Sequence, residues 1–141
     1  WTIKEISEQP MSISRALNYG GRIDDDVRVK LGGLEDAKDV LLPIHHLIIT
    51  GCGTSFFAGQ LGAKIMRHLN TFDTVQAIDS AEVGLDTFPR NGGGVCLISQ
   101  SGETKDVHRV LNMTEELDLP RFSVVNAVGS LIARATNCGV Y

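Results

Sequence analysis

The chain has 141 residues, which is long enough to bury one hydrophobic core and too short for two domains of ordinary size. Hydrophobic residues make up 43% and charged residues 21%, a composition typical of a soluble globular domain and not of a disordered segment. The formal net charge of −4 argues against nucleic acid as the main partner, because phosphate backbones select basic surfaces. No apolar run approaches the roughly 20 residues of a membrane span, so a membrane partner is not expected either.

Residues 1–43 are expected to form a helical region that precedes the main run of strands. A helix is predicted within residues 5–21, starting near Pro10, because proline is tolerated in a first helical turn, and ending at the glycine pair that follows. Gly32 and Gly33 are expected to open a second helix through residues 34–42, which the next proline stops.

From residue 44 onward, short apolar runs alternate with segments of helical periodicity. The runs are bounded by Gly, Asn, Asp or Ser, as buried parallel strands are, and lie at 47–49, 75–78, 95–98, 122–125 and 139–141. Helices are expected over 58–69 and 107–117, with a shorter one over 80–87 that has Ser80 as its N-cap. This alternation predicts an α/β fold, a doubly wound three-layer sandwich around a five-stranded parallel sheet of flavodoxin-like order 2-1-3-4-5.

Two loops rich in small hydrogen-bonding groups follow the first and third of these strands, at residues 51–55 (GCGTS) and 99–104 (SQSGET). Ligands of open α/β sheets bind beyond the carboxyl ends of the strands, and the order 2-1-3-4-5 makes the first and third strands neighbours. The two loops are therefore expected to face one cleft. Glycines, hydroxyls and helix N-termini together favour a phosphate. The predicted phosphate ligands are Ser55, Ser99, Ser101 and Thr104, and Thr54 and Gln100 are expected to reach sugar hydroxyls.

Two other interpretations of these loops stay open. Each loop alone is compatible with an ordinary helix N-cap and turn. The occurrence of two such loops, at neighbouring strands, favours a ligand-binding site. A dinucleotide-binding domain is the second alternative, since Gly51 and Gly53 follow a strand and Asp79 ends the next one. However, Phe56 stands at the third glycine of that fingerprint, and a dinucleotide leaves the second loop unexplained.

The cysteines and histidines predict neither a disulfide nor a metal site. Cys52, Cys96 and Cys138 are odd in number and far apart, and we expect them to be reduced thiols of a cytoplasmic protein. His45 and His46 are adjacent, and adjacent strand residues point to opposite faces, so the two do not readily ligate one ion. No metal and no cofactor are expected.

The same loops resemble a known family. Residues 51–59 (GCGTSFFAG) and 99–104 (SQSGET) look like the signature loops of the sugar isomerase (SIS) domain. More narrowly, the chain resembles the isomerase domain of the glutamine–fructose-6-phosphate aminotransferase family, of the eukaryotic type. That similarity is carried by residues 1–10, 21–22, 31–34, 126–134 and 138–140. It implies a single SIS domain over residues 1–141, of which 1–43 are the N-terminal helical region.

The resemblance implies an enzyme that uses glutamine-derived ammonia to convert fructose 6-phosphate to glucosamine 6-phosphate, for UDP-N-acetylglucosamine synthesis. The family's substrate contacts carry over onto the same six residues, Thr54, Ser55, Ser99, Gln100, Ser101 and Thr104. A glutaminase domain would precede Trp1, which is not a methionine, and a second SIS half with the catalytic residues would follow Tyr141. Neither Lys64 nor Lys105 matches the family's imine-forming lysine, so this chain is expected to hold no catalytic residue and to be inactive alone.

Two further expectations follow from the resemblance. Family members act as dimers or larger assemblies, so a homo-oligomer is expected for the full-length protein. A non-enzymatic SIS module that senses sugar phosphates remains the alternative from a different functional class.

Eukaryotic-type members are inhibited by UDP-N-acetylglucosamine, which binds in this domain away from the substrate cleft. The contacts carried over are Arg22, Gly32, Gly33, Thr136 and Gly139. Ala133 and Tyr141 stand where a serine and a histidine are usual, and losing a hydroxyl contact costs about 0.5–1.5 kcal/mol, so a weakened site is expected. The alternative is that Arg22 is a surface residue and the glycines form a helix-start turn.

Overall fold

A five-stranded parallel sheet forms the centre of the computed structural model, which describes residues 1–25 and 28–141. Its strands are β3 (His46–Gly51), β4 (Thr74–Asp79), β5 (Gly93–Ser99), β6 (Arg121–Val125) and β7 (Gly139–Val140). They lie in the order β4-β3-β5-β6-β7, and every neighbouring pair is parallel. In chain order this is 2-1-3-4-5, so the predicted flavodoxin-like topology is confirmed. The central strands β3 and β5 are buried almost throughout, as strands covered on both faces must be.

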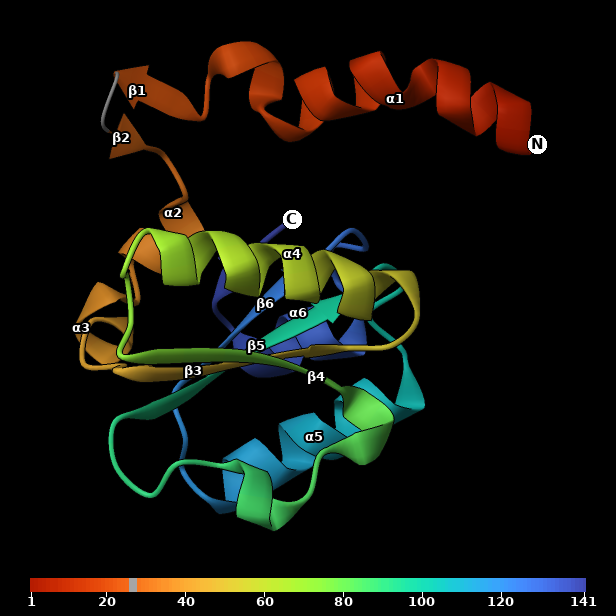
Figure 1. The fold of residues 1–141 in the computed structure, drawn as a ribbon. Coiled ribbons are helices and arrows are strands. Elements are labelled where there is room, and N and C mark those ends of the chain that lie inside the picture. Colours follow the sequence, from red (N-terminus) through yellow and green to blue (C-terminus); the bar gives the residue numbers. More distant parts are fainter. Residues whose placement is uncertain (26–27) are drawn as a thin grey trace.

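Helices cover both faces of this sheet, and Figure 1 shows α4 (Thr54–His68) on one side and α5 (Lys105–Glu116) on the other. Alternate residues of β3 point to the two layers. Leu47 and Ile49 pack with Ala63 of α4, whereas Ile48 packs with α5 and with Ile132 of α6 (Leu131–Thr136). The predicted three-layer sandwich is therefore confirmed, with one hydrophobic core on each face of the sheet.

The N-terminal region comprises α1 (Thr2–Ala16), the 3-10 turn η1 (Asn18–Gly20), an antiparallel pair β1 (Ile23–Asp25) and β2 (Arg28–Val29), and the short helices α2 (Gly32–Glu35) and α3 (Lys38–Leu41). It begins with elements that stand apart from the sheet, α1 to β2, and ends with α2 and α3, which lie close to it (Figure 1). No residue of α1 is buried. Among the described residues, no helix combines the length and the apolar character needed to cross a bilayer.

Three expectations for local structure were wrong. The first helix begins at Thr2, and Pro10 lies inside it instead of in its first turn. Proline removes one backbone hydrogen bond, and the exposure of α1 leaves the freed carbonyl open to water. The second helix opens at Gly32 as expected, but it is broken into α2 and α3 instead of running through residue 42, and the pair β1–β2 was not expected.

The expected helix over 80–87 is instead two 3-10 turns, η2 (Ser80–Glu82) and η3 (Leu85–Thr87). The Arg109 guanidinium explains the break, because it donates to the backbone carbonyls of Ser80, Ala81 and Val83, which an α-helix would need. Ser80 is not the cap. Its buried hydroxyl bonds to a threonine of β3, and Asp79 caps the turn by accepting from the Ala81 N–H at 3.0 Å.

Candidate functional site

A cleft of about 390 Å³ opens at the carboxyl ends of the neighbouring strands β3 and β5. Both hydroxyl-rich loops border it, together with the first turn of α4 and the end of β6. The lining residues are Thr54, Ser55, Ala58, Ile98, Ser99, Gln100, Val124 and Asn126. Four of the six predicted substrate contacts, Thr54, Ser55, Ser99 and Gln100, are thus brought to one cleft.

The first loop lies directly against β5 at the base of this cleft. Gly51 ends β3, and a Cβ at that position would stand 2.8 Å from the Ile98 carbonyl oxygen and 3.1 Å from Ser55 Cβ. A larger residue would therefore push the first loop away from β5. Because Gly51 has no side chain, the N-terminus of the 15-residue helix α4 lies at the edge of the cleft.

The second loop is folded by its own hydroxyls. Ser99 is buried, and its Oγ accepts from the Gly102 N–H at 3.0 Å and lies 3.0 Å from Thr104 Oγ1. Ser101 is exposed, and its Oγ accepts from the Glu103 N–H at 3.2 Å. Ser101 and Thr104 do not line the cleft themselves, but these bonds fix them in the loop whose other members do.

Every side chain that lines the cleft is uncharged. The groups offered to a ligand are hydroxyls, amides and the N-terminus of α4, whose dipole favours an anion. Cys52, in the first loop, is not an activated nucleophile, because burial and then the nearby Asp79 and Asp106 carboxylates raise the pKa of its thiol, outweighing a hydrogen bond from Ser80 that lowers it. The cleft therefore offers a ligand uncharged hydroxyls and amides.

Asn126 lines the cleft and was not among the predicted contacts. It follows β6, which pairs with β5, so its place at the same sheet edge follows from the predicted strand order. Its carboxamide can both donate to and accept from a ligand. Ligands of open α/β sheets bind beyond the carboxyl ends of the strands, and this expectation applied to the fourth strand would also have identified Asn126.

A second pocket of about 170 Å³ lies between the N-terminal region and the last strand. Its lining includes two cations, Arg22 and Lys30, and is completed by Leu31, Gly32, Gly33, Gly139, Val140 and Tyr141. Arg22 donates from Nη2 to the Tyr141 carbonyl, and Lys30 Nζ pairs with Asp24 at 2.9 Å. Four of the five residues expected to contact a nucleotide sugar, Arg22, Gly32, Gly33 and Gly139, are thereby brought together.

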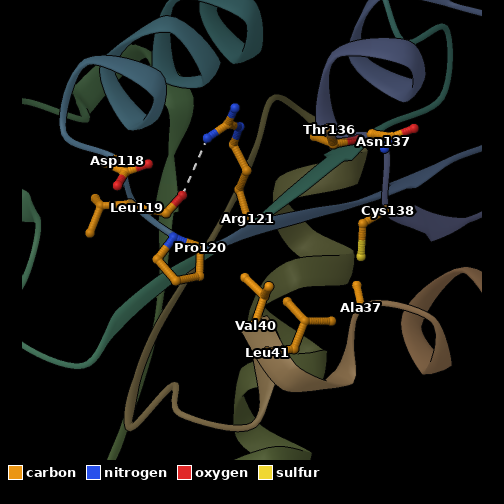
Figure 2. Close-up of a pocket in the computed structure, with 10 residues that line it drawn as sticks. All are labelled: Ala37, Val40, Leu41, Asp118, Leu119, Pro120, Arg121, Thr136, Asn137 and Cys138. Atoms are coloured by element: carbon orange, nitrogen blue, oxygen red, sulfur yellow. Dashed lines mark hydrogen bonds between the residues drawn. The ribbon is translucent and has the colours of Figure 1, made fainter.

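The structure does not bring Thr136 into this second pocket. Thr136 is buried, and its hydroxyl bonds to Ser123 Oγ at 2.8 Å and donates to the Ile132 carbonyl at 2.9 Å. It borders a different hollow of about 500 Å³ between α3, the start of β6 and the segment after α6. Figure 2 shows this hollow with the Arg121 side chain on one side and the apolar residues of α3 on the other. Ala133 is buried, and its carbonyl accepts from Tyr141 Oη at 3.4 Å.

Comparison with known proteins identifies the family. Residues 41–141, more than half of the chain, match the SIS domain. The chain belongs to the SIS domain family. It is 36% identical over 98% of its length to glutamine–fructose-6-phosphate aminotransferase [isomerizing] 1 of Rattus norvegicus, and 38% identical over 98% of its length to the aminotransferase of Saccharomyces cerevisiae.

This SIS chain spans only about a fifth of those relatives, 20% of the rat protein and 19% of the yeast protein. Its fold is similar to the C-terminal domain of glucosamine-fructose-6-phosphate aminotransferase from Francisella tularensis, with a TM-score of 0.84 and 24% identity, covering 99% of this chain and 38% of that one. The chain therefore corresponds to the SIS portion of the aminotransferases, and its coverage of them is that of one SIS half.

Proposed function

We propose that the cleft at the ends of β3 and β5 binds fructose 6-phosphate or glucosamine 6-phosphate. The chain would be the sugar-phosphate-binding half of the isomerase domain of a glutamine–fructose-6-phosphate aminotransferase. The observation that carries the proposal is the convergence of two hydroxyl-rich loops on one uncharged cleft at the N-terminus of α4. The names of the aminotransferase relatives support the choice of sugar phosphate.

The groups around the cleft divide into two roles. The hydroxyls of Ser55, Ser99, Ser101 and Thr104, with the N-terminus of α4, would surround the phosphate dianion, since helix dipoles and neutral donors stabilise an anion without a lysine. Ser55 and Ser99 already line the cleft. Ser101 and Thr104 would turn from their loop toward the phosphate on binding. Thr54 and Gln100 would bind the sugar hydroxyls. A cleft of about 390 Å³ lies within the usual size range of small-ligand sites.

The chemistry of amine transfer would lie outside this chain. Lys64 on α4 and Lys105 on α5 are exposed, and neither lines the cleft. We propose that residues 1–141 form one SIS domain with residues 1–43 as its helical region. A glutaminase domain and a second SIS domain of the same cytoplasmic, homo-oligomeric protein would complete the enzyme without a cofactor.

Calorimetry tests the proposal by titrating the chain with fructose 6-phosphate and, separately, with fructose. We expect saturable binding of the phosphate ester and none of the free sugar. Ser101→Ala should weaken binding by roughly ten- to hundredfold, since a hydrogen bond to a charged group contributes roughly 1.5–3 kcal/mol. Ser7→Ala is the matched control, because Ser7 is an exposed serine on α1 whose hydroxyl donates to the Ile3 carbonyl. No binding by the wild-type chain, or equal affinity in Ser101→Ala, would refute the assignment.

A sensing module would share this cleft, so binding alone does not separate it from an enzyme. The chain is expected to form no glucosamine 6-phosphate from fructose 6-phosphate and ammonia. Detectable product would contradict the proposal that the catalytic residues lie elsewhere. A glutaminase domain next to this chain in the full-length protein would favour the enzyme, and a DNA-binding helical domain there would favour the sensor.

We also propose that the second pocket binds a nucleotide sugar, with UDP-N-acetylglucosamine as an inhibitor. The supporting observation is that Arg22 and Lys30 flank the glycines 32, 33 and 139, because a guanidinium can pair bidentately with a diphosphate. Arg22→Ala should weaken binding of UDP-N-acetylglucosamine about tenfold, with the exposed Arg15→Ala as control. No heat with the wild-type chain, or equal affinity in Arg22→Ala, would refute this second site.

A further inference from the structure

We infer that Glu103 is a positioning residue, whose carboxylate holds the 99–104 loop against the N-terminus of α6. This inference rests on the proposed function of the loop in sugar-phosphate binding. Glu103 lies inside the SQSGET segment, yet it does not line the cleft and was not among the predicted contacts. Its carboxylate points instead to a helix that begins 28 residues further along the chain.

The contacts join the loop to the first turn of α6. Glu103 Oε1 accepts from the Leu131 N–H at 2.8 Å, and the carbonyl of Gly102 accepts from the Ile132 N–H at 3.1 Å. The first N–H groups of a helix have no partner within the helix and need one from outside. Ser130, the N-cap residue of α6, makes no side-chain cap bond, and its buried Oγ has no hydrogen-bond partner among the described residues. Glu103 therefore supplies the cap that Ser130 does not.

The same two loop residues also hold the hydroxyls. The N–H groups of Gly102 and Glu103 donate to Ser99 Oγ and Ser101 Oγ. Gly102 has φ of +67°, and a Cβ on it would overlap the Ser130 side chain, so the loop lies directly against the start of α6. Releasing the carboxylate would remove one of the two bonds that join the loop to α6, and with it part of the restraint on the peptide whose N–H donates to Ser101.

The charge of Glu103 supports a structural role for its carboxylate. It is the only charged residue in the 99–104 segment, and a carboxylate beside a phosphate would repel it. In the structure the carboxylate instead accepts from the Leu131 N–H at the start of α6, and Glu103 does not line the cleft. An acidic residue in an anion-binding loop thus has a physical reason to be there.

Two variants test this inference with fructose 6-phosphate as the probe. Glu103→Ala loses the acceptor and should weaken binding by roughly three- to tenfold, the net effect of one hydrogen bond. Glu103→Gln keeps an amide oxygen that can accept the same bond, and should bind within about twofold of wild type. Glu116→Ala is the matched control, because Glu116 is an exposed glutamate at the far end of α5.

Hydrogen exchange separates this inference from the proposed function. The Leu131 and Ile132 amides should exchange faster in Glu103→Ala than in wild type or Glu103→Gln, whether or not sugar phosphate is present. Wild-type affinity in Glu103→Ala, or equal weakening in both variants, would overturn the positioning role. Absence of binding by the wild-type chain would refute the proposed function, and unchanged exchange at Leu131 would then refute the cap as well.

Discussion

Replacing Ser99 with alanine is expected to lower the stability of the fold as well as the affinity of the cleft. Ser99 is 3% exposed, and its hydroxyl accepts from the Gly102 N–H and bonds to Thr104 Oγ1. Gly102 is also buried, so alanine would leave its N–H without a partner and without water. Leaving a buried donor unpaired costs about 1–3 kcal/mol. For a chain of this length, each kcal/mol lowers Tm by about 4 °C.

Ser101→Ala provides the comparison within the same loop. Ser101 is exposed, and the Glu103 N–H that donates to it can turn to water instead. Its loss should change the free energy of unfolding by less than about 0.5 kcal/mol. Urea unfolding without ligand measures both variants. The reasoning is refuted if Ser99→Ala unfolds within about 0.5 kcal/mol of wild type, or if Ser101→Ala loses as much stability as Ser99→Ala.

Two further variants test the packing of the loop and of the sheet. Gly102→Ala should lower the free energy of unfolding by about 2–5 kcal/mol, the sum of the cost of a left-handed backbone conformation and the cost of overlap with Ser130. Gly129 also has a positive φ, of +83°, but open space surrounds it, so Gly129→Ala should lower the free energy of unfolding by only about 1–2 kcal/mol. Complete burial raises the pKa of the Cys96 thiol from 9.0 to about 12, so the folded state keeps a proton that the unfolded chain loses between these values. Stability should therefore fall as pH rises from 9.0 to about 12, by up to about 1.4 kcal/mol per pH unit, and Cys96→Ala should remove this part of the slope.

Each of these two predictions would be contradicted by a specific result. Equal losses in the two glycine variants, measured by urea unfolding, would show that contact with Ser130 is not what requires a glycine at position 102. Parallel stability profiles for wild type and Cys96→Ala above pH 9 would show that the thiol is not held protonated by burial.

The sheet was predictable because its strands are short apolar runs with clear boundaries, and because right-handed crossovers leave few orders for alternating strands and helices. The turns after β4 were not, because Arg109 binds three of their carbonyls from 26 to 29 residues away. No local pattern encodes such a contact. Pro10 is predicted in a first turn because proline is tolerated there, and the exposure of α1 that tolerates it inside the helix is a property of the fold.

The candidate site was predictable to the level of loops and less so to the level of atoms. Small polar residues at two neighbouring strand ends indicated one cleft, and the structure places both loops around it. The sequence could not show that the Ser99 hydroxyl is engaged within its own loop, or that Thr136 is turned into the core. A serine whose hydroxyl binds a ligand and a serine whose hydroxyl bonds to its own backbone look the same in a sequence, so the sequence does not distinguish them.

The central claim is that the cleft between residues 51–55 and 99–104 binds a sugar phosphate. Its most direct test is an NMR titration of the isotope-labelled chain with fructose 6-phosphate, read amide by amide. Saturable shifts should be largest at residues 53–55 and 100–104, with smaller changes at Asn126 and none along α1. No saturable shift, or largest shifts around Arg22 and Gly139 with the cleft unchanged, would contradict the claim.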